Sequence, residues 1–199
     1  MNRGFLFKIL FWVLLALPAA MLLSGFWHRP VGVEADRFLH PSGEFSARLL
    51  IFALVLTPLS RLLPHSGILR WLLRHRRSIG VAAFGYAALH LLFYVLDKGA
   101  VHEIIAELRD PALWTGWLAF LCLLVPATVS NDRAMRALKA GWKRIQRLAY
   151  AAAILTLAHW ALIDGSIGHA VVNFAPLILL QLLRLFTARR HAKAEPNGG

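Results

Sequence analysis

The chain has 199 residues, of which 58% are hydrophobic and 16% charged, and its formal net charge is +12 at pH 7. This composition, with several apolar runs near the ~20 residues needed to cross a bilayer, predicts an integral membrane protein and argues against a soluble one. Because Cys122 is its one cysteine, the sequence also excludes an internal disulfide and a thiolate cluster for zinc or an iron–sulfur centre.

Six apolar runs follow one another along the chain, and each is long enough to form a helix that satisfies its own backbone in lipid. We expect an all-α, six-helix transmembrane bundle with helices over residues 5–27, 45–63, 78–97, 111–130, 147–164 and 169–187. These helices form one domain over residues 1–190, and residues 191–199 are predicted to be a disordered cytoplasmic tail.

The first run needs separate treatment, because Arg3 and Lys8 precede it as basic residues precede a secretory signal. Its apolar part, residues 9–27, is longer than the roughly 7 to 15 residues of a signal peptide. We therefore expect a retained helix, which Pro18 can kink. Cleavage would instead leave five helices in an unchanged orientation.

Lysine and arginine are distributed unevenly between the two sides of the predicted bundle. They concentrate at the N-terminus, in the second and fourth connections and in the tail region, whereas the other side has Arg29, Arg37, Arg48, Lys98 and Arg109. By the positive-inside rule, this distribution predicts that both termini are cytoplasmic. It also explains the net charge without nucleic acid, which is not an expected partner.

Two histidines, His90 and His159, each lie alone inside an apolar run. Each follows the basic end of its run, at Ser78 and Arg147 respectively, by 12 residues. At about 1.5 Å per residue, both imidazoles lie ~18 Å from the cytoplasmic boundary, so they should face each other at one depth. A polar group in lipid is expensive and neutral imidazoles are strong metal ligands, so the pair predicts the two axial ligands of a haem iron.

Alanine lies seven residues before each of these histidines, at Ala83 and Ala152, and Ala87 continues the stripe in the third run. Small side chains would leave space for a flat macrocycle, although close packing of helices also favours alanine. Structural hydrogen bonding is the alternative role for the histidines, whereas the ligand sets of zinc and copper sites do not converge in the sequence. Six other histidines lie in loops or at helix ends and are assigned no ligand role: His28, His40, His65, His102, His169 and His191.

Several segments along the chain carry a resemblance to a known family. They are residues 56–59 (LTPL), 76–80 (RRSIG), 88–91 (ALHL) and 130–135 (SNDRAM), followed by residues 142–150 and His159-Trp160. In order and spacing these segments resemble the MsrQ (YedZ) family. That family is the haem-binding membrane subunit of the periplasmic methionine sulfoxide reductase system, within the ferric-reductase-like transmembrane group.

The resemblance implies a six-helix b-type cytochrome of the bacterial inner membrane. It implies electron transfer to MsrP, a soluble periplasmic molybdopterin enzyme that reduces oxidised methionines in proteins, so that sulfoxide reduction itself occurs in the partner. It aligns His90 and His159 with the family's ligands of haem b. It also associates electron supply with quinol or a cytoplasmic flavin reductase, and with bound FMN.

One position departs from the family pattern. Family members usually have a further histidine at the start of the fifth helix, where this chain has Gln146. The equivalent level on the third helix is Arg77, so a second haem at the cytoplasmic face has no obvious ligands. His75 is near enough to the cytoplasmic end to be a substitute ligand there, but a solvated loop histidine is the favoured interpretation. We expect one well-defined haem, with any second site weak or flavin-like. On that side Arg77, Gln146 and Arg147 are the predicted contacts for haem propionates or a flavin.

Two other functions stay open at this point. The chain could be a stand-alone transmembrane ferric or quinone reductase that uses the same haem. It could instead be a transporter or structural membrane protein without haem, in which the histidines serve protons or packing. The sequence has no glycine-rich phosphate loop, so electrons would arrive from another protein, a quinone or a bound flavin.

Overall fold

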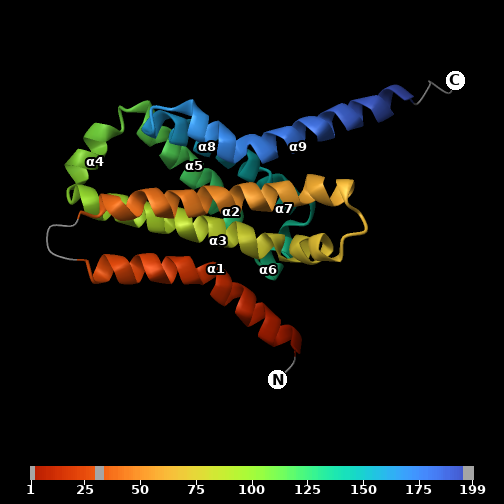
Figure 1. Cartoon of the computed structure of the whole chain (residues 1–199), viewed down its shortest axis with the longest axis horizontal. Helices are drawn as coiled ribbons and strands as arrows, with labels where there is room; N and C mark the ends of the chain where they lie inside the picture. The colour runs from red at the N-terminus through yellow and green to blue at the C-terminus, as the bar shows by residue number, and fades with distance from the viewer. Residues whose placement is uncertain (1–2, 30–33, 195–199) are drawn as a thin grey trace.

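A computed structural model describes residues 3–29 and 34–194, and within them every regular element is a helix (Figure 1). The predicted tail begins inside the last helix, which continues to Ala194. Residues 195–199 lie outside the described residues, so the disorder of the tail stays a prediction. The nine helices of the described part are α1 (Arg3–Trp27), α2 (Asp36–Leu62), α3 (Gly67–Lys98), α4 (Val101–Glu107), α5 (Pro111–Thr128), α6 (Asp132–Leu138), α7 (Ala140–Gln146), α8 (Leu148–Ile163) and α9 (Ile167–Ala194).

Each of the six predicted runs coincides with one helix, namely α1, α2, α3, α5, α8 and α9. The all-α prediction is therefore confirmed for the described part of the chain. Five of these helices, α1, α2, α3, α5 and α9, are long and apolar enough to cross a membrane. α8 has 16 residues, fewer than the ~20 of a typical span. A sixth crossing and the cytoplasmic position of the termini stay predictions.

Two helices begin several residues before their predicted starts. α2 begins at Asp36 rather than at residue 45, and α3 begins at Gly67 rather than at residue 78. The apolar pattern missed both beginnings, because the first turns of these helices contain charged side chains. A helix can extend beyond the lipid with such side chains in water. Ser66 caps α3 by accepting a hydrogen bond from the backbone N–H of Leu69.

The helices around the two histidines have defined ends. Asp110 accepts a hydrogen bond from the backbone N–H of Ala112 at 2.8 Å, and Pro111 occupies the first turn of α5. Gly99 ends α3 with φ of 69°, and Gly165 follows α8 with φ of 60°. Other residues rarely adopt this left-handed backbone, so the glycines favour helix ends at these points.

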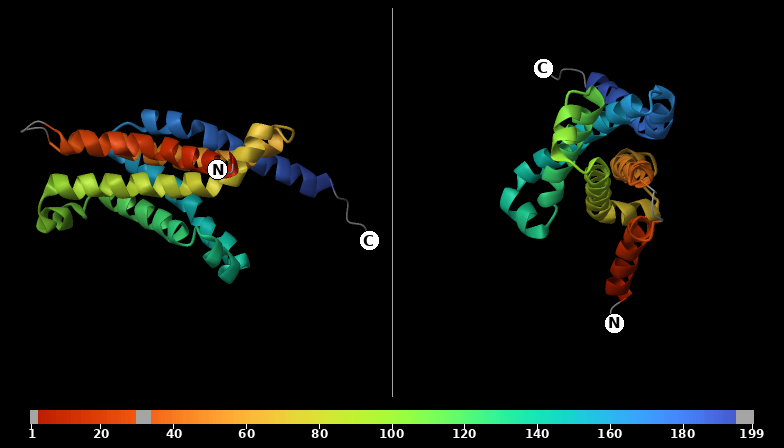
Figure 2. Two further views of the ribbon diagram at one scale, coloured as in Figure 1. Left: turned by 90° about the horizontal axis from the view of Figure 1, so that it is seen from below. Right: turned by 90° about the vertical axis from the view of Figure 1, so that its left-hand side faces the viewer.

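The helices form two closely packed pairs, α2 with α3 and α5 with α8. α9 packs against α2 and α8 and so joins the pairs, while α1 packs against α3 and α2 on the outside of the bundle (Figure 2). The short helices α6 and α7 connect α5 to α8. A functional site between the pairs can therefore draw side chains from four helices.

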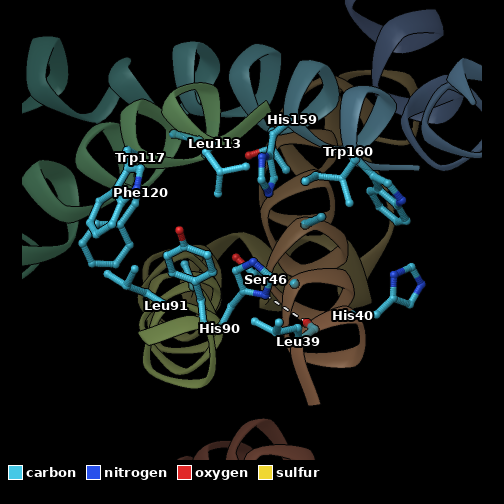
Figure 3. Close-up of a pocket in the computed structure, with 18 of the residues that line it drawn as sticks. Leu39, His40, Ser46, His90, Leu91, Leu113, Trp117, Phe120, His159 and Trp160 are labelled. Atoms are coloured by element: carbon cyan, nitrogen blue, oxygen red, sulfur yellow. Dashed lines mark hydrogen bonds between the residues drawn. The ribbon is translucent and has the colours of Figure 1, made fainter. Parts of the chain in front are cut away.

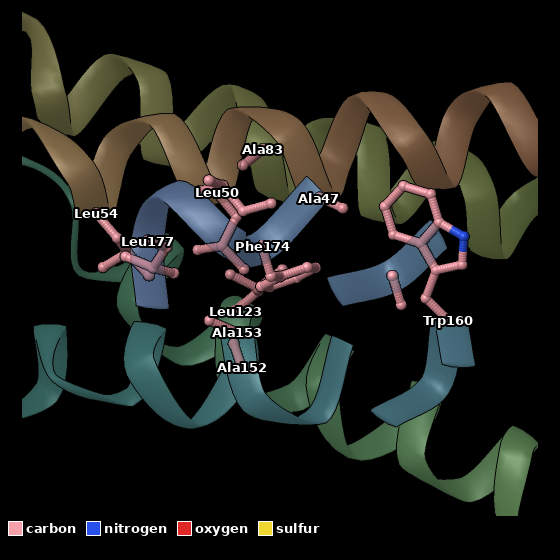
Figure 4. Close-up of a cluster of buried hydrophobic side chains, with 12 residues drawn as sticks. Ala47, Leu50, Leu54, Ala83, Leu123, Ala152, Ala153, Trp160, Phe174 and Leu177 are labelled. Carbon is pink, nitrogen blue, oxygen red and sulfur yellow. The ribbon is translucent and has the colours of Figure 1, made fainter. Parts of the chain in front are cut away.

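A buried hydrophobic cluster ties the two pairs together (Figure 4). Phe174 of α9 is 2% exposed and lies between Leu50 of α2 and Ala153 of α8. Ala83 of α3 and Ala152 of α8 are completely buried in the same cluster. Their small side chains allow the neighbouring helices to approach closely.

The kinked helix α1 is attached to α3 through one phenol group. α1 bends near its middle, close to Pro18 (Figure 1). At the bend the hydroxyl of Tyr86 donates to the carbonyl of Leu15 at 2.8 Å and accepts from the N–H of Ala19 at 3.0 Å. An unbroken helix would join these two backbone groups directly. Tyr86 therefore gives a hydrogen-bond partner to two backbone groups beside Pro18, where surrounding lipid could offer none.

This bridge predicts the effect of removing the Tyr86 hydroxyl. In Tyr86→Phe the backbone groups of Leu15 and Ala19 lose their partner in an apolar environment, so we expect a loss of about 1–3 kcal/mol in stability. Thermal unfolding of the detergent-solubilised protein measures it. Tyr150→Phe is the matched control, because the Tyr150 hydroxyl has no hydrogen bond among the described residues. Equal losses in the two variants would contradict the bridging role.

Candidate functional site

A cavity of about 420 Å³ lies between the two helix pairs. Its walls come mainly from α2, α3, α5 and α8, and Glu107 of α4 joins them at one end. Near the centre the walls are apolar, with Leu113, Trp117 and Phe120 of α5 opposite Leu91 of α3 (Figure 3). One end of the cavity, here called the rim, carries the charged side chains Asp36, Glu44, Asp97, Lys98, Glu107 and Asp164.

His90 from α3 and His159 from α8 project into this cavity towards each other (Figure 3). Their ring centroids are 6.3 Å apart, and the ring planes are inclined at 81°. The structure thus brings together the two histidines that the sequence paired. His90 lies about two turns before the end of α3 and His159 about one turn before the end of α8, so the pair is near the rim.

Each imidazole is held by a backbone carbonyl of the partner helix in its own pair. Nδ1 of His90 donates to the carbonyl of Leu39 in α2 at 2.9 Å, and Nδ1 of His159 donates to the carbonyl of Ala112 in α5 at 2.6 Å. A carbonyl can only accept, so the proton of each neutral ring lies on Nδ1. Nε2 is then left with a free lone pair, as in histidines that bind metals.

The ring geometry fits one metal ion between the two histidines. An imidazole nitrogen binds a transition metal at about 2 Å and lies ~1 Å from the ring centre, so two ligands on opposite sides of one ion have centres about 6 Å apart. The observed separation is 6.3 Å. Within the described part of the chain, no three His, Cys, Asp or Glu side chains gather as a metal-binding group. The pair therefore suits a metal whose other ligands come from a macrocycle, as in haem.

The alanines that were expected to leave space beside the histidines lie elsewhere, with one exception. Ala83 and Ala152 are buried in the hydrophobic cluster and not in the cavity. The expectation that they leave room for a macrocycle is therefore wrong, and close helix packing explains them. Ala87 does line the cavity. The free volume extends from Ala87 and Leu123, past the histidines, to the rim.

The three residues predicted to contact a cofactor on the cytoplasmic side do not line this cavity. Arg77 forms an ion pair with Asp132 at 2.6 Å, which links α3 to α6, and its hydrogen bond lowers the pKa of the Asp132 carboxyl. Gln146 donates to the Ser130 hydroxyl at 3.2 Å and to a backbone carbonyl of α5 at 3.1 Å. Arg147 is exposed. Arg77 and Gln146 therefore already serve contacts within the bundle.

Several groups at the site were not predicted from the sequence. His40 was expected in a loop, but it belongs to α2 and lines the rim of the cavity. The carbonyls of Leu39 and Ala112 leave no sequence signal, because every residue supplies one. Gly43 and Gly116 line the cavity beside the imidazoles. The sequence signal that could have identified these two glycines is a hydroxyl residue directly before each of them, in Ser42-Gly43 and Thr115-Gly116.

At the rim, one carboxylate holds α4 against α3. Glu107 accepts hydrogen bonds from Nζ of Lys98 at 2.5 Å and from the hydroxyl of Tyr94 at 2.8 Å. These bonds, chiefly the one from Lys98, hold the pKa of the Glu107 carboxyl below its usual value. Glu107 thereby fixes part of the cavity wall through a charged contact that depends on pH.

Comparison with known proteins gives a consistent match along the chain. The family described as "Ferric reductase like transmembrane component" matches residues 42–157. The "Protein-methionine-sulfoxide reductase heme-binding subunit MsrQ" of Caulobacter vibrioides is 32% identical over 197 residues, which cover 94% of this chain and 90% of the relative. Proteins of the same name from Xanthomonas campestris pv. campestris (32% over 168 residues, 79% and 75%) and Azospira oryzae (34% over 160 residues, 77% and 66%) are also similar. No solved structure matches the chain significantly.

The Lys98–Glu107 contact predicts a pH-dependent effect of Glu107→Gln. The folded-state pKa lies below the usual 4.5. The carboxylate therefore contributes its full stabilisation above that pH and loses it as the pH falls through the folded-state pKa. We expect the variant to be less stable at neutral pH by about 1 kcal/mol or less, and the difference to shrink below pH 4.5.

Thermal unfolding of both proteins across this pH range makes the comparison. Glu103→Gln, an exposed carboxylate on the same helix, is the control and should change stability less. A Glu107→Gln difference that stays constant down to low pH would contradict the assignment.

Proposed function

This chain belongs to the MsrQ family of ferric-reductase-like membrane proteins, and we propose that it is a b-type cytochrome of the bacterial inner membrane. It relays electrons to a periplasmic molybdopterin enzyme that reduces methionine sulfoxide in oxidised proteins. The observation that carries this proposal is the facing pair His90 and His159, with centroids 6.3 Å apart in a cavity of about 420 Å³. The relatives are named heme-binding subunits, and haem is the group that this spacing suits.

His90 and His159 would hold haem b through their Nε2 atoms. When bound, the haem supplies a one-electron iron couple. Leu91, Leu113 and Phe120 offer an apolar surface for the macrocycle. With both His90 and His159 bound to the iron, no coordination position would be left for a substrate. This chain therefore acts as a relay, and the sulfoxide is reduced in the partner.

The backbone contacts of the two imidazoles support the relay role. The carbonyls of Leu39 and Ala112 fix the orientation of each ring and increase the electron density on its Nε2 atom. Electron transfer is faster when few atoms move as the iron changes its oxidation state. The two carbonyl contacts lie within closely packed helix pairs, which limits movement of the rings. The apolar side chains of the cavity also keep water away from the imidazoles, which limits competing reactions.

The position of the cavity supports the proposed direction of transfer. The cavity extends from the histidines to the rim, which includes Asp97 and Asp164. The arginine-rich first part of α3 and the basic helices α6 and α7, which precede α8, lie at the opposite end of the bundle. Under the positive-inside rule the rim faces the periplasm, which is the side of the proposed partner.

The opposite end of the bundle suits an electron donor better than a second haem. Gln146 stands where the family usually has histidine, and an amide is a poor ligand for haem iron. Its side chain instead hydrogen-bonds Ser130. We therefore propose one haem b per chain. Supply by quinol or a cytoplasmic flavin reductase, and FMN beside Arg77, Gln146 and Arg147, are proposals from the family resemblance alone.

The ligand assignment predicts the absorption spectrum of purified protein. In detergent, the wild-type chain should show a reducible low-spin b-type spectrum, and His90→Ala and His159→Ala should each abolish it because one axial ligand is lost. His65→Ala and His102→Ala are controls, since neither residue lines the cavity. A colourless wild-type protein would contradict the proposal and favour a transporter or structural role.

The departure at Gln146 predicts the haem content. Haem quantified against protein should give a ratio close to one, and a ratio close to two would contradict the single site.

The same purified protein tests which molecule accepts its electrons. Reduced protein should be reoxidised by the periplasmic methionine sulfoxide reductase in the presence of sulfoxide, whereas reoxidation by ferric chelates alone would favour a stand-alone reductase.

A further inference from the structure

The same three-residue arrangement occurs beside each of the two histidines. In α2 the carbonyl of Leu39 accepts from His90, and Ser42 and Gly43 follow three and four residues later. In α5 the carbonyl of Ala112 accepts from His159, and Thr115 and Gly116 follow at the same spacing. Residues three and four positions apart share a helix face. A carbonyl, a hydroxyl and a glycine therefore meet each imidazole in matching order.

The glycines leave the space that the imidazole rings occupy. A Cβ atom on Gly116 would lie 2.8 Å from Nδ1 and Cε1 of His159, which is too close for the ring to stay where it is. A Cβ atom on Gly43 would lie 3.1 Å from the same two atoms of His90. Gly80 and Gly85, two other helical glycines on α3, have nothing within 4 Å of such an atom. Gly25 of α1 would also meet a ring, that of Phe38 at 3.2 Å, but among the described glycines only Gly43 and Gly116 lie against a histidine.

The hydroxyls act on the carbonyls that hold the rings. The Ser42 hydroxyl oxygen lies 2.8 Å from the carbonyls of both Phe38 and Leu39, which share its one proton, and 3.4 Å from Nδ1 of His90. The Thr115 hydroxyl likewise shares its proton between the carbonyls of Pro111 and Ala112, both at 2.8 Å. Both residues are buried, at 0% and 6% exposure. A carbonyl oxygen has two lone pairs and can accept from the hydroxyl and the imidazole N–H together, and sharing it between two donors weakens each bond.

We propose that Ser42-Gly43 and Thr115-Gly116 are matched positioning elements for the two haem-ligating imidazoles, in which the glycine sets the place of the ring and the hydroxyl tunes its hydrogen bond. The inference rests on the proposed function, because it concerns how His90 and His159 present Nε2 to an iron. It assigns a role to four residues outside the ligand set. At both glycines the atoms nearest to the added Cβ belong to the proposed ligands themselves.

The glycine part is tested with alanine variants in haem-loaded protein. Gly116→Ala should displace His159, lower haem occupancy several-fold or convert part of the low-spin spectrum to high spin. Gly43→Ala should do the same to a smaller degree, because its clash is milder. Gly80→Ala and Gly85→Ala are controls and should keep the wild-type spectrum. Wild-type occupancy and spectrum in Gly116→Ala would overturn the role of the glycines.

The angle between the imidazole planes offers a readout that a loss of folding would not produce. The electron paramagnetic resonance signal of low-spin ferric haem depends on this angle, which is 81° between the two rings here. We expect the strongly anisotropic signal of nearly perpendicular ligands in wild-type protein. The signal should shift in the haem that Gly43→Ala still binds, and an unchanged signal would count against the positioning role.

The hydroxyl part is tested with Thr115→Val, which keeps the shape of the side chain and removes only the hydroxyl. The carbonyl of Ala112 then accepts more strongly from His159, the imidazole becomes more electron-rich, and the ferric state is favoured. We expect a lower midpoint potential with unchanged haem content, and the same direction in Ser42→Ala. Val125→Thr, which places a hydroxyl on the exposed face of α5, is the control and should leave the potential unchanged.

The outcomes separate this inference from the proposed function. Wild-type protein without haem would overturn the proposed function and the inference with it. Wild-type protein with a bis-histidine spectrum, combined with an unchanged or raised potential in Thr115→Val, would overturn the hydroxyl role alone. Loss of haem in the Gly80→Ala and Gly85→Ala controls to the same extent as in Gly116→Ala would overturn the glycine role alone.

Discussion

Two hydrogen bonds constrain the whole arrangement, one from Nδ1 of His90 to the carbonyl of Leu39 and one from Nδ1 of His159 to the carbonyl of Ala112. A polar N–H inside an apolar bundle needs an acceptor, and a backbone carbonyl is the acceptor that a helix always provides. Each bond lies within a helix pair, α3 to α2 and α8 to α5. The directions of both rings are therefore set by their closest neighbours before any ligand is present, which is the condition for a preorganised site.

The sequence predicted the main helices and the meeting of the two histidines, because both depend on regular spacing. Apolar runs mark the helices, and the distance from the basic end of each run gives the level of His90 and His159. The beginning of α2 could not be predicted in this way. Asp36 and Glu44 interrupt the apolar pattern there, and Pro41 argues against a helix, although all three lie within α2. His40 was consequently assigned to a loop instead of the rim.

Small residues were harder to interpret than histidines, because their meaning depends on what lies opposite. Ala83 and Ala152 suggested space for a cofactor, yet Leu50 and Phe174 belong to the cluster that buries them. Gly116 attracted no attention in the sequence, yet an imidazole lies against it. A small side chain signals close approach in either case. Only the partner helix decides whether the approaching group is a hydrophobic side chain or a ligand, and one sequence does not contain that information.

The two ends of the bundle differ in charge: one is rich in arginine, and the other carries the carboxylates of the rim. At the arginine-rich end, Arg77 joins α3 to α6 through Asp132. At the other end, carboxylates such as Asp97 and Asp164 line the rim of the cavity in a chain whose net charge is +12. For the proposed cytochrome, negative charge near the iron favours its oxidised, more positive form, whereas the apolar cavity walls disfavour that form. The rim and the walls therefore act in opposite directions on the potential, and the carbonyl tethers shift the balance towards the oxidised state.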